Sequence, residues 1–242
     1  MHKSGTASLA GKGKEFSGNL FEIRLECGII FVKYATKTER THSVRRKEGK
    51  TDMKYASNNI RNILIAGHAG SGKTTLTEAL VYFSGAAERM GRVEDGTTIS
   101  DFDPEEAKRK ASLSASVVPV EYEGIKYNLI DAPGLFDFEA GEYEGIRAAE
   151  SVLVVVSGRS GVTVGAEKAF QLARKNGKAT MVFVSKCDLE NANYFKILED
   201  MKIKFGSTVC PCVVPAKLDD GTPVYINLFS QKAFKYESGK QI

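Results

Sequence analysis

The sequence predicts an α/β fold of three layers, in which a mainly parallel sheet lies between helices. From residue 55 onward, short apolar runs alternate with segments of helical spacing, which is typical of parallel βα units. The run at 152–156 is apolar at every position, as expected of a strand that is buried on both faces. A glycine-rich turn at 67–75 joins another apolar run to a helix. These observations place one α/β domain at residues 55–206.

Positive charge is concentrated at the start of the chain. Residues 1–54 hold 12 lysines and arginines against 6 acidic residues, whereas residues 56–242 hold 22 against 24. The predicted domain therefore has no basic surplus that would favour binding to DNA. Three hypotheses remain for this basic N-terminal extension: a disordered tail, an arm that contacts RNA, or translated sequence upstream of a start at Met53. A strand or two is predicted within 20–34.

Composition and length point to a soluble, cytoplasmic protein. The chain has 242 residues, of which 42% are hydrophobic, and no apolar run approaches the ~20 residues of a membrane-spanning helix. A secretory signal is not expected either, because the basic start lacks a sustained apolar segment. The four cysteines lack C-x-x-C spacing, which favours reduced thiols. We expect a monomer with no membrane partner.

The first elements of the domain follow from apolar spacing. The run at 63–66 predicts a buried strand, and apolar residues three or four apart predict a helix at 74–83. The next stretch, 85–111, is polar and is expected to be either a functional loop or disordered. Within it, Asp103 before Pro104, followed by two glutamates, predicts the start of a helix.

A hairpin and further alternating elements complete the predicted domain. Strand-like runs at 116–122 and 125–130 flank Glu123-Gly124, which predicts a tight turn between them. After the hairpin, each apolar run is followed by a helical pattern. The remaining predicted elements are strands at 151–157 and 180–184, helices at 141–150, 166–175 and 194–205, and short β-prone runs within 208–236.

The turn at 67–75 carries a phosphate-binding motif. Residues 67–74 fit G-x-x-x-x-G-K-[ST] without a mismatch, between a strand and a helix. Glycines allow backbone N–H groups to surround phosphate oxygens, and the helix N-terminus attracts the same anion. Lys73 is expected to bind the β- and γ-phosphates, and the Thr74 hydroxyl is expected to bind Mg²⁺. The alternative is an ordinary glycine-rich turn. The predicted phosphate-binding residues are Gly67, His68, Ala69, Gly70, Ser71, Gly72, Lys73, Thr74 and Thr75.

Two further strand ends carry polar motifs. Asp131-Ala132-Pro133-Gly134 follows one strand, where Asp131 would hold Mg²⁺ and the Gly134 amide would face the γ-phosphate. Without the phosphate loop, this motif would be simple turn chemistry.

The second motif, Ser185-Lys186-Cys187-Asp188, follows another strand. Asp188 could accept hydrogen bonds from N1–H and N2–H₂ of guanine, a donor pattern that adenine does not offer. Alone, the motif would be taken for a solvated Lys and Asp pair in a loop.

Together these motifs resemble the G domain of translational GTPases, most closely elongation factor G and its paralogues. The resemblance covers about residues 55–242. It implies a P-loop GTPase fold, GTP or GDP with Mg²⁺ as ligands, and the ribosome as a partner that is contacted through domains missing from this chain. It also implies that 207–242 begins an insert subdomain and that the family sequence continues beyond Ile242 into further domains. Besides the three motifs, the resemblance is carried by the runs 92–98, 101–106, 157–162 and 232–236, and by Asp137-Phe138.

Three residues depart from the family pattern. Ser185 replaces the usual asparagine of the guanine motif, so guanine preference is expected to survive through Lys186 and Asp188, though weakened. Ser112 stands where the family has a threonine that closes on Mg²⁺, and it keeps the hydroxyl. Leu135 replaces the histidine that orients the attacking water, and leucine has no donor or acceptor for that purpose. Slow intrinsic hydrolysis is therefore expected.

The roles implied by the resemblance leave several hypotheses. Lys73 and Gly134 would be catalytic, Leu135 would not, and Mg²⁺ would be held by Thr74, Ser112 and Asp131. The chain would belong to a ribosome-dependent GTPase that drives translocation, or to a paralogue that protects or regulates ribosomes. It could also be a GTP-bound switch that hydrolyses poorly. An ATP-using P-loop enzyme is disfavoured by the guanine motif.

Overall fold

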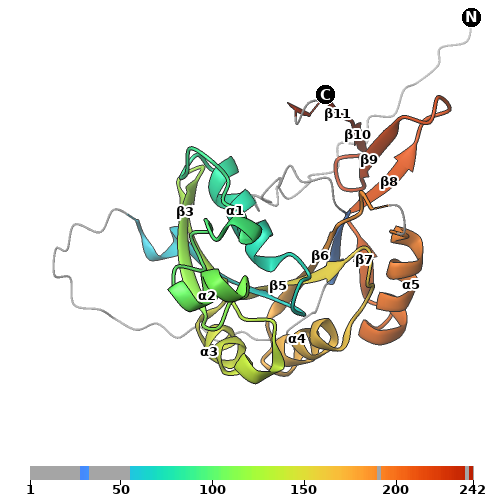
Figure 1. The fold of residues 1–242 in the computed structure, drawn as a ribbon. Helices are drawn as coiled ribbons and strands as arrows, with labels where there is room; N and C mark the ends of the chain where they lie inside the picture. The colour runs from blue at the N-terminus through green and yellow to red at the C-terminus, as the bar shows by residue number, and fades with distance from the viewer. Residues whose placement is uncertain (1–27, 33–54, 190–191, 238–239, 242) are drawn as a thin grey trace, which may run out of the picture.

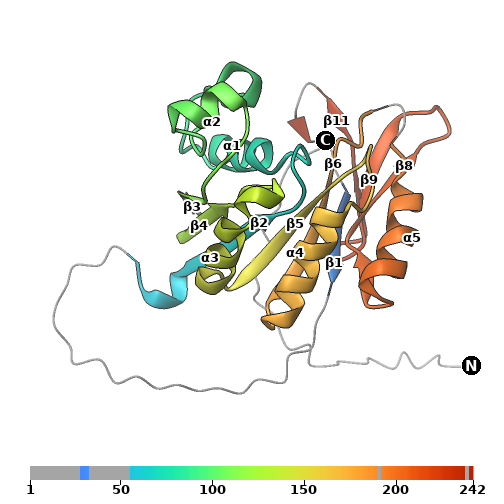
Figure 2. The ribbon, with the colours of Figure 1, turned by 60° about the horizontal axis from the view of Figure 1, so that its bottom comes forward.

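The computed structural model describes residues 28–32, 55–189, 192–237 and 240–241. A twisted sheet lies between helices, with α1 (Lys73–Phe83) on one face and α3 (Ala140–Ala148), α4 (Val164–Lys175) and α5 (Tyr194–Phe205) on the other (Figure 1). Figure 2 shows that α2 (Pro104–Arg109) lies on the same side of the sheet as α1. The predicted three-layer α/β fold is confirmed.

Seven strands form the main sheet. The central strands β4, β2, β5 and β6 are parallel, so their carboxyl ends meet at one edge. Strands at both sides of this parallel core are antiparallel to their neighbours. In spatial order the strands are β3 (Ser116–Tyr122), β4 (Ile125–Asp131), β2 (Ile60–Ala66), β5 (Ser151–Ser157), β6 (Ala179–Ser185), β1 (Gly28–Val32) and β7 (Val209–Pro211).

The hairpin β3–β4 forms at the predicted turn. Glu123 and Gly124 have φ angles of 49° and 78°, so both central residues lie in the left-handed region. This is the geometry of a type I′ turn, whose twist matches that of the flanking strands.

Strand β1 corrects the prediction that residues 1–54 lie outside the α/β domain. A strand within 20–34 was expected, but β1 enters the main sheet, antiparallel to both β6 and β7. Local periodicity predicts a strand without naming its partner, because register depends on the strands that flank it. The proposed tail, RNA-binding arm and start at Met53 concern residues outside the described ranges. For the rest of residues 1–54, the predicted domain boundary at residue 54 stays a prediction.

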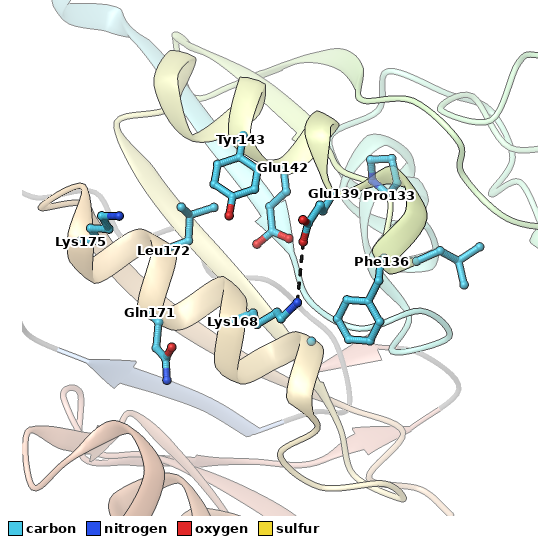
Figure 3. Close-up of a pocket in the computed structure, with 12 residues that line it drawn as sticks. Pro133, Phe136, Glu139, Glu142, Tyr143, Lys168, Gln171, Leu172 and Lys175 are labelled. Atoms are coloured by element: carbon cyan, nitrogen blue, oxygen red, sulfur yellow. Dashed lines mark ion pairs between the residues drawn. The ribbon is translucent and has the colours of Figure 1, made fainter.

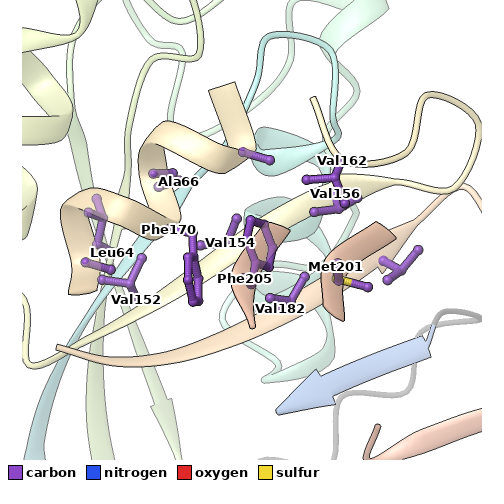
Figure 4. Packing of buried hydrophobic residues seen from close by; sticks show 14 of the residues in the cluster. Leu64, Ala66, Val152, Val154, Val156, Val162, Phe170, Val182, Met201 and Phe205 are labelled. Atoms are coloured by element: carbon purple, nitrogen blue, oxygen red, sulfur yellow. The ribbon is translucent and has the colours of Figure 1, made fainter. Parts of the chain in front are cut away.

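Two apolar cores fill the space above and below the sheet. Neighbouring residues of β5, Val154 and Val155, are both fully buried but belong to different cores, as expected for a strand covered on both faces. In the core beneath α4 and α5, the rings of Phe170 and Phe205 stack with centroids 4.1 Å apart (Figure 4). These cores fix the ends of the parallel strands, where the predicted site lies.

The polar stretch 85–111 is folded rather than disordered, and its functional role stays a prediction. Glu78 of α1 is buried, and its carboxylate accepts hydrogen bonds from the backbone amides of Gly91 (3.1 Å) and Ile99 (2.5 Å). Glu106 of α2 is also buried and accepts from the amide of Leu113 at 2.8 Å. The predicted helix start is confirmed, since Asp103 forms a capping box with Glu106.

The last part of the chain forms small antiparallel sheets. Strands β8 (Val213–Lys217), β9 (Pro223–Asn227) and β10 (Lys232–Phe234) make one sheet, and β11 (Tyr236–Glu237) pairs with β12 (Lys240–Gln241). The assignment of residues 207–242 to an insert subdomain stays a prediction.

None of the helices in the described ranges has the length and apolar character that crossing a bilayer requires. Short 3-10 helices occur at Ser57–Asn59, Val93–Asp95 and Phe136–Phe138.

Candidate nucleotide-binding site

The three sequence motifs meet at the carboxyl edge of the parallel strands. The loop after β2 contacts the loop after β4, because the Ala69 amide donates to the Gly134 carbonyl at 3.0 Å. It also contacts the loop after β6, because Lys186 Nζ donates to the Gly70 carbonyl at 2.8 Å. Ligand sites of open α/β sheets lie at this edge, where loops from separate strands converge.

Gly67 shows why the phosphate loop needs glycine. Its φ is 138°, and a Cβ built there would lie 2.5 Å from the Val155 carbonyl oxygen of β5. Gly70 and Gly72 also have positive φ, at 71° and 96°, but their added Cβ atoms would meet no such backbone contact. The loop is therefore packed tightly against the sheet at its first residue and is more open further along.

Lys73 is buried inside the loop. Its side chain is 6% exposed, and Nζ donates to the His68 carbonyl at 3.1 Å. Burial lowers the pKa of Lys73, while the negative charges of Asp131, Glu142 and Asp101 act in the opposite direction. To bind a phosphate, the ammonium group would exchange the His68 carbonyl for a phosphate oxygen.

Gly134 closes the loop from the other side. A Cβ on Gly134 would collide with Lys73 Nζ and would lie 2.6 Å from the Ala69 amide nitrogen. Only glycine allows the backbone to approach the phosphate loop this closely. The predicted pairing of Lys73 and Gly134 around one phosphate position is therefore geometrically compatible with the structure.

Asp131 has the environment of a cation ligand. It is 1% exposed, and neither carboxylate oxygen has a hydrogen-bond partner among the described residues. Burial raises the pKa of Asp131 to about 6, although the charge of Lys73 opposes this shift. A buried carboxylate without a partner is costly unless a cation neutralises it, so these residues fit Mg²⁺.

The other predicted Mg²⁺ ligands lie together. The hydroxyls of Thr74 and Ser112 are 3.2 Å apart, although the two residues are far apart in sequence. Hydroxyl and carboxylate oxygens are the hard ligands that Mg²⁺ prefers. The structure thus brings Ser112 next to Thr74, and the role of Ser112 as a Mg²⁺ ligand stays a prediction.

Sequence reasoning gave Asp101 no role, but the structure places it at this site. Asp101 is 5% exposed, and its Oδ1 accepts a hydrogen bond from the Ser112 hydroxyl at 2.7 Å. In the sequence it is one of several acidic residues in a polar stretch. Its burial depends on how that stretch folds onto α1, which no local pattern indicates.

Ser185 connects the predicted guanine motif to the phosphate loop. Its hydroxyl donates to the Ser71 carbonyl at 2.6 Å, and the residue is 7% exposed. A serine hydroxyl has one hydrogen to donate, so Ser185 has no second donor for a purine base. Asp188 is exposed at the end of the motif and lies open to a ligand.

Leu135 and its neighbours line a cavity next to the Gly134 loop. The cavity has a volume of 290 Å³ and lies between α3 and α4 (Figure 3). Lys168 pairs with Glu139 at 3.7 Å and lies 4.4 Å above the Phe136 ring. That ring is 5.7 Å from the His68 ring of the phosphate loop. A movement of the segment after Gly134 would therefore change its contacts with both α4 and the phosphate loop.

Glu142 projects into this cavity from α3 (Figure 3), and its burial predicts a pH-dependent stability. Burial raises the pKa of Glu142 from 4.5 to about 7. Ionisation is thus harder in the folded protein, so the wild type loses stability as pH rises from about 4.5 to 7. We expect Glu142→Gln to be more stable than the wild type at pH 8, by up to about 3 kcal/mol, with a smaller gain at pH 5.

Urea denaturation at pH 5 and pH 8 measures this difference. Glu144→Gln, at an exposed position of the same helix, is the matched control and should change little at either pH. An equal gain for Glu142→Gln at both pH values would contradict the prediction.

The fold and these loops define a P-loop nucleotide-binding protein. Residues 58–238 match the family described as the Elongation factor Tu GTP binding domain, and the chain belongs to this family of translational GTPases. Within it, the chain is similar to elongation factor G-like proteins, as the sequence motifs predicted.

Several relatives support this assignment. The chain is 36% identical over 182 residues to an elongation factor G-like protein of Mycobacterium tuberculosis (strain CDC 1551 / Oshkosh), covering 75% of this chain and 25% of the relative. It is 31% identical over 183 residues to the mitochondrial ribosome-releasing factor 2 of Drosophila ananassae, covering 76% and 25%. A crystal structure of a Thermus thermophilus protein superposes with a TM-score of 0.69 and 41% identity, covering 76% and 27%. The chain thus spans about a quarter of the length of these relatives.

Proposed function

We propose that this chain is the GTP-binding and GTP-hydrolysing domain of an elongation factor G-like translation factor that acts on the ribosome during translocation. The observation that carries the proposal is the meeting of Lys73, Gly134 and the unpartnered Asp131 carboxylate at one edge of the sheet. Relatives named for elongation and for ribosome release support a ribosomal partner. We expect the protein to act in the cytoplasm as a monomer.

Separate groups of the chain would bind the phosphates and the cation. The backbone amides of 67–73 and the N-terminus of α1 would hold the phosphates, and Lys73 would neutralise the charge between the β- and γ-groups. Thr74, Ser112 and Asp131 would hold Mg²⁺, which supplies further positive charge next to the transferred phosphoryl group. The Gly134 amide would turn toward the γ-phosphate once its carbonyl releases the Ala69 amide.

Guanine selection would depend on the loop after β6. Asp188 would accept from the N1–H and N2–H₂ donors of the base, and Lys186 would pack along its face. Ser185, held to the Ser71 carbonyl, would fix this loop against the phosphate loop rather than contact the base.

Slow intrinsic hydrolysis is part of the proposal. Leu135 is 40% exposed beside Gly134 and has no group that could orient a water molecule. The same observation supports a second candidate function, a ribosome-associated switch that binds GTP and hydrolyses it weakly for protection or regulation of ribosomes.

Nucleotide competition tests the proposal. A fluorescent GDP analogue should be displaced by GTP and GDP, and ATP should need at least a ~100-fold higher concentration, because adenine lacks the donors that Asp188 accepts. Displacement by ATP at the same concentration as GTP would overturn the guanine assignment. Single-turnover hydrolysis by a full-length homologue, measured with and without ribosomes, then separates the two candidates. A translocase should be strongly stimulated by ribosomes and a weakly hydrolysing switch should not.

A further inference from the structure

The strand that carries the guanine motif at its end is completed by residues from the N-terminal extension. β6 pairs with β5 on one side and with β1 on the other, where Gly28 lies opposite Val184 and Val32 lies opposite Thr180. Within the described ranges, β7 pairs with β1 alone. β1, blue in Figure 1, therefore fills the space between β6 and β7 and joins them into one sheet.

β1 lies outside the part of the chain that matches the family. The matched residues begin at 58, whereas β1 ends at Val32. The connection between them, which includes residues 33–54 outside the described ranges, is long enough to extend over roughly 70 Å. A connection of this length does not fix the place of a strand. The place of β1 is set by backbone pairing with β6 and β7, which is how a separate extended segment joins a sheet.

Loss of β1 would leave a gap with the properties of a strand-binding site. Val182, Phe183 and Val184 of β6 are buried, and their backbone groups on the side of β1 would have no strand to pair with. Buried backbone groups without partners are costly, so the gap favours an extended segment that satisfies them. β1 has the sequence Gly-Ile-Ile-Phe-Val, whose uninterrupted apolar run is typical of a strand covered on both faces.

This strand-binding site adjoins the guanine motif. Val184, which lies opposite Gly28, directly precedes Ser185. The Ser185 carbonyl accepts from the Gly158 amide at 2.6 Å, and the Ser185 hydroxyl donates to the Ser71 carbonyl at 2.6 Å. The end of β6 is thus held to the phosphate loop and to the loop after β5, while β1 holds it on the side away from β5.

The chain that follows the guanine motif depends on β1 as well. α5 begins at Tyr194, a buried residue whose hydroxyl donates to the Val213 carbonyl at 2.8 Å. Val213 begins β8, two residues after β7 ends at Pro211. Asp188 lies in the sequence between β6 and Tyr194, so β1 supports the chain both before and after it.

We propose that the space between β6 and β7 is a binding site for one extended apolar segment, that residues 28–32 occupy it, and that its occupancy raises the affinity for guanine nucleotide by fixing the loop that carries Asp188. The coupling to nucleotide rests on the proposed function. Because coupling between two sites is reciprocal, nucleotide must strengthen the binding of β1 by the same factor. The N-terminal extension would thus control the guanine end of the nucleotide site.

Hydrogen exchange of the full chain tests both parts of the proposal. The backbone amides of 28–32 should be protected, and saturating GDP should slow their exchange about 10-fold, within the range typical of two coupled sites. β3, at the opposite edge of the sheet, is the internal control and should respond less. Exchange of 28–32 at the rate of an unstructured peptide would overturn the strand-binding site. An equal effect of GDP on β1 and β3 would overturn the coupling.

Ile30→Pro in the full chain tests the coupling from the other direction. Ile30 lies opposite both Val182 and Pro211, and proline there removes a backbone donor from the middle of the strand. GDP affinity should fall about 10-fold, the same factor as in the exchange experiment. Thr38→Pro, in the same extension but outside β1, is the matched control and should bind GDP like the wild type.

A peptide of residues 26–34 with Cys27→Ser separates loss of the strand from misfolding. Added to the Ile30→Pro protein, it should restore GDP affinity, whereas the same peptide carrying Ile30→Pro should not. Failure of both peptides to restore affinity would overturn the strand-binding site. Equal GDP affinity in Ile30→Pro and the wild type would overturn the coupling and leave the proposed function intact. A wild type that binds no GDP would overturn the proposed function, while the exchange of 28–32 would still decide whether the strand-binding site exists.

Discussion

Gly67→Ala is expected to reduce GTP and GDP affinity about 100-fold and to lower the free energy of unfolding by about 2–4 kcal/mol. The added Cβ would lie 2.5 Å from the Val155 carbonyl oxygen, and φ is 138°, a value that alanine rarely adopts. Val155 is fully buried in the middle of β5, so the strand has no room to move. The start of the phosphate loop would shift instead, and a shift of about 1 Å in a preorganised site costs on the order of 100-fold.

Variants of two other glycines distinguish the collision with β5 from backbone strain as the cause of the lost affinity and stability. Gly85 has φ of 80° with nothing within 4 Å of an added Cβ, and it lies beyond the end of α1. Gly85→Ala should therefore cost about 1 kcal/mol of stability and leave nucleotide affinity unchanged. Gly70 has the same open geometry inside the loop, so Gly70→Ala should fall between the two variants. Chemical denaturation and displacement of a fluorescent GDP analogue measure both quantities. Affinity of Gly67→Ala within threefold of the wild type would contradict the argument.

The parallel core and the phosphate loop could be predicted because local patterns specify them. The all-apolar run of β5 has the composition of a strand covered on both faces, and Glu123-Gly124 has the residues of a tight hairpin turn. Lys73 was identified from the phosphate-loop motif after β2, and Asp131 from the D-x-P-G motif at the end of β4. Parallel strands bring such residues to one edge without any further information.

Other features could not be predicted, since they depend on contacts between distant segments. The apolar residues of β1 indicate a strand but not its place between β6 and β7. Asp101 is buried within a segment whose backbone donates hydrogen bonds to Glu78 and Glu106. Ser185 was noted only as a departure from the family's asparagine, and its contact with the Ser71 carbonyl had no signal in the sequence. In each case the local sequence gives no signal of where the residue lies, because its position depends on packing against distant segments.

Leu135, which stands where the family has a histidine, also matters for its place in the structure, apart from the hydrogen-bonding groups that leucine lacks. Leu135 is followed by Phe136, which contacts both His68 and Lys168. The segment after Gly134 is therefore connected to the phosphate loop and α4 by side chains other than Leu135. We infer that its response to nucleotide does not require the side chain at position 135.

Leu135→His is expected to increase single-turnover GTP hydrolysis about 100-fold, the lower end of what a positioned acid–base group contributes. The imidazole would supply the donor and acceptor that leucine lacks, next to the Gly134 amide. Leu135 has φ of −83° and ψ of 138°, a common extended conformation, and it is 40% exposed, so histidine fits without strain. GTP affinity should stay within about twofold, because the phosphate loop is unchanged.

Leu135→Met is the matched control for this gain. Methionine has a similar volume and no strong hydrogen-bonding group, so its hydrolysis rate should equal that of the wild type. The rates are measured with limiting GTP and excess protein, with affinity determined separately for each variant. A Leu135→His rate no faster than the wild type would mean that water positioning does not limit hydrolysis in this chain. An equal gain in Leu135→Met would instead assign the slow rate to the shape of leucine rather than to its missing hydrogen bonds.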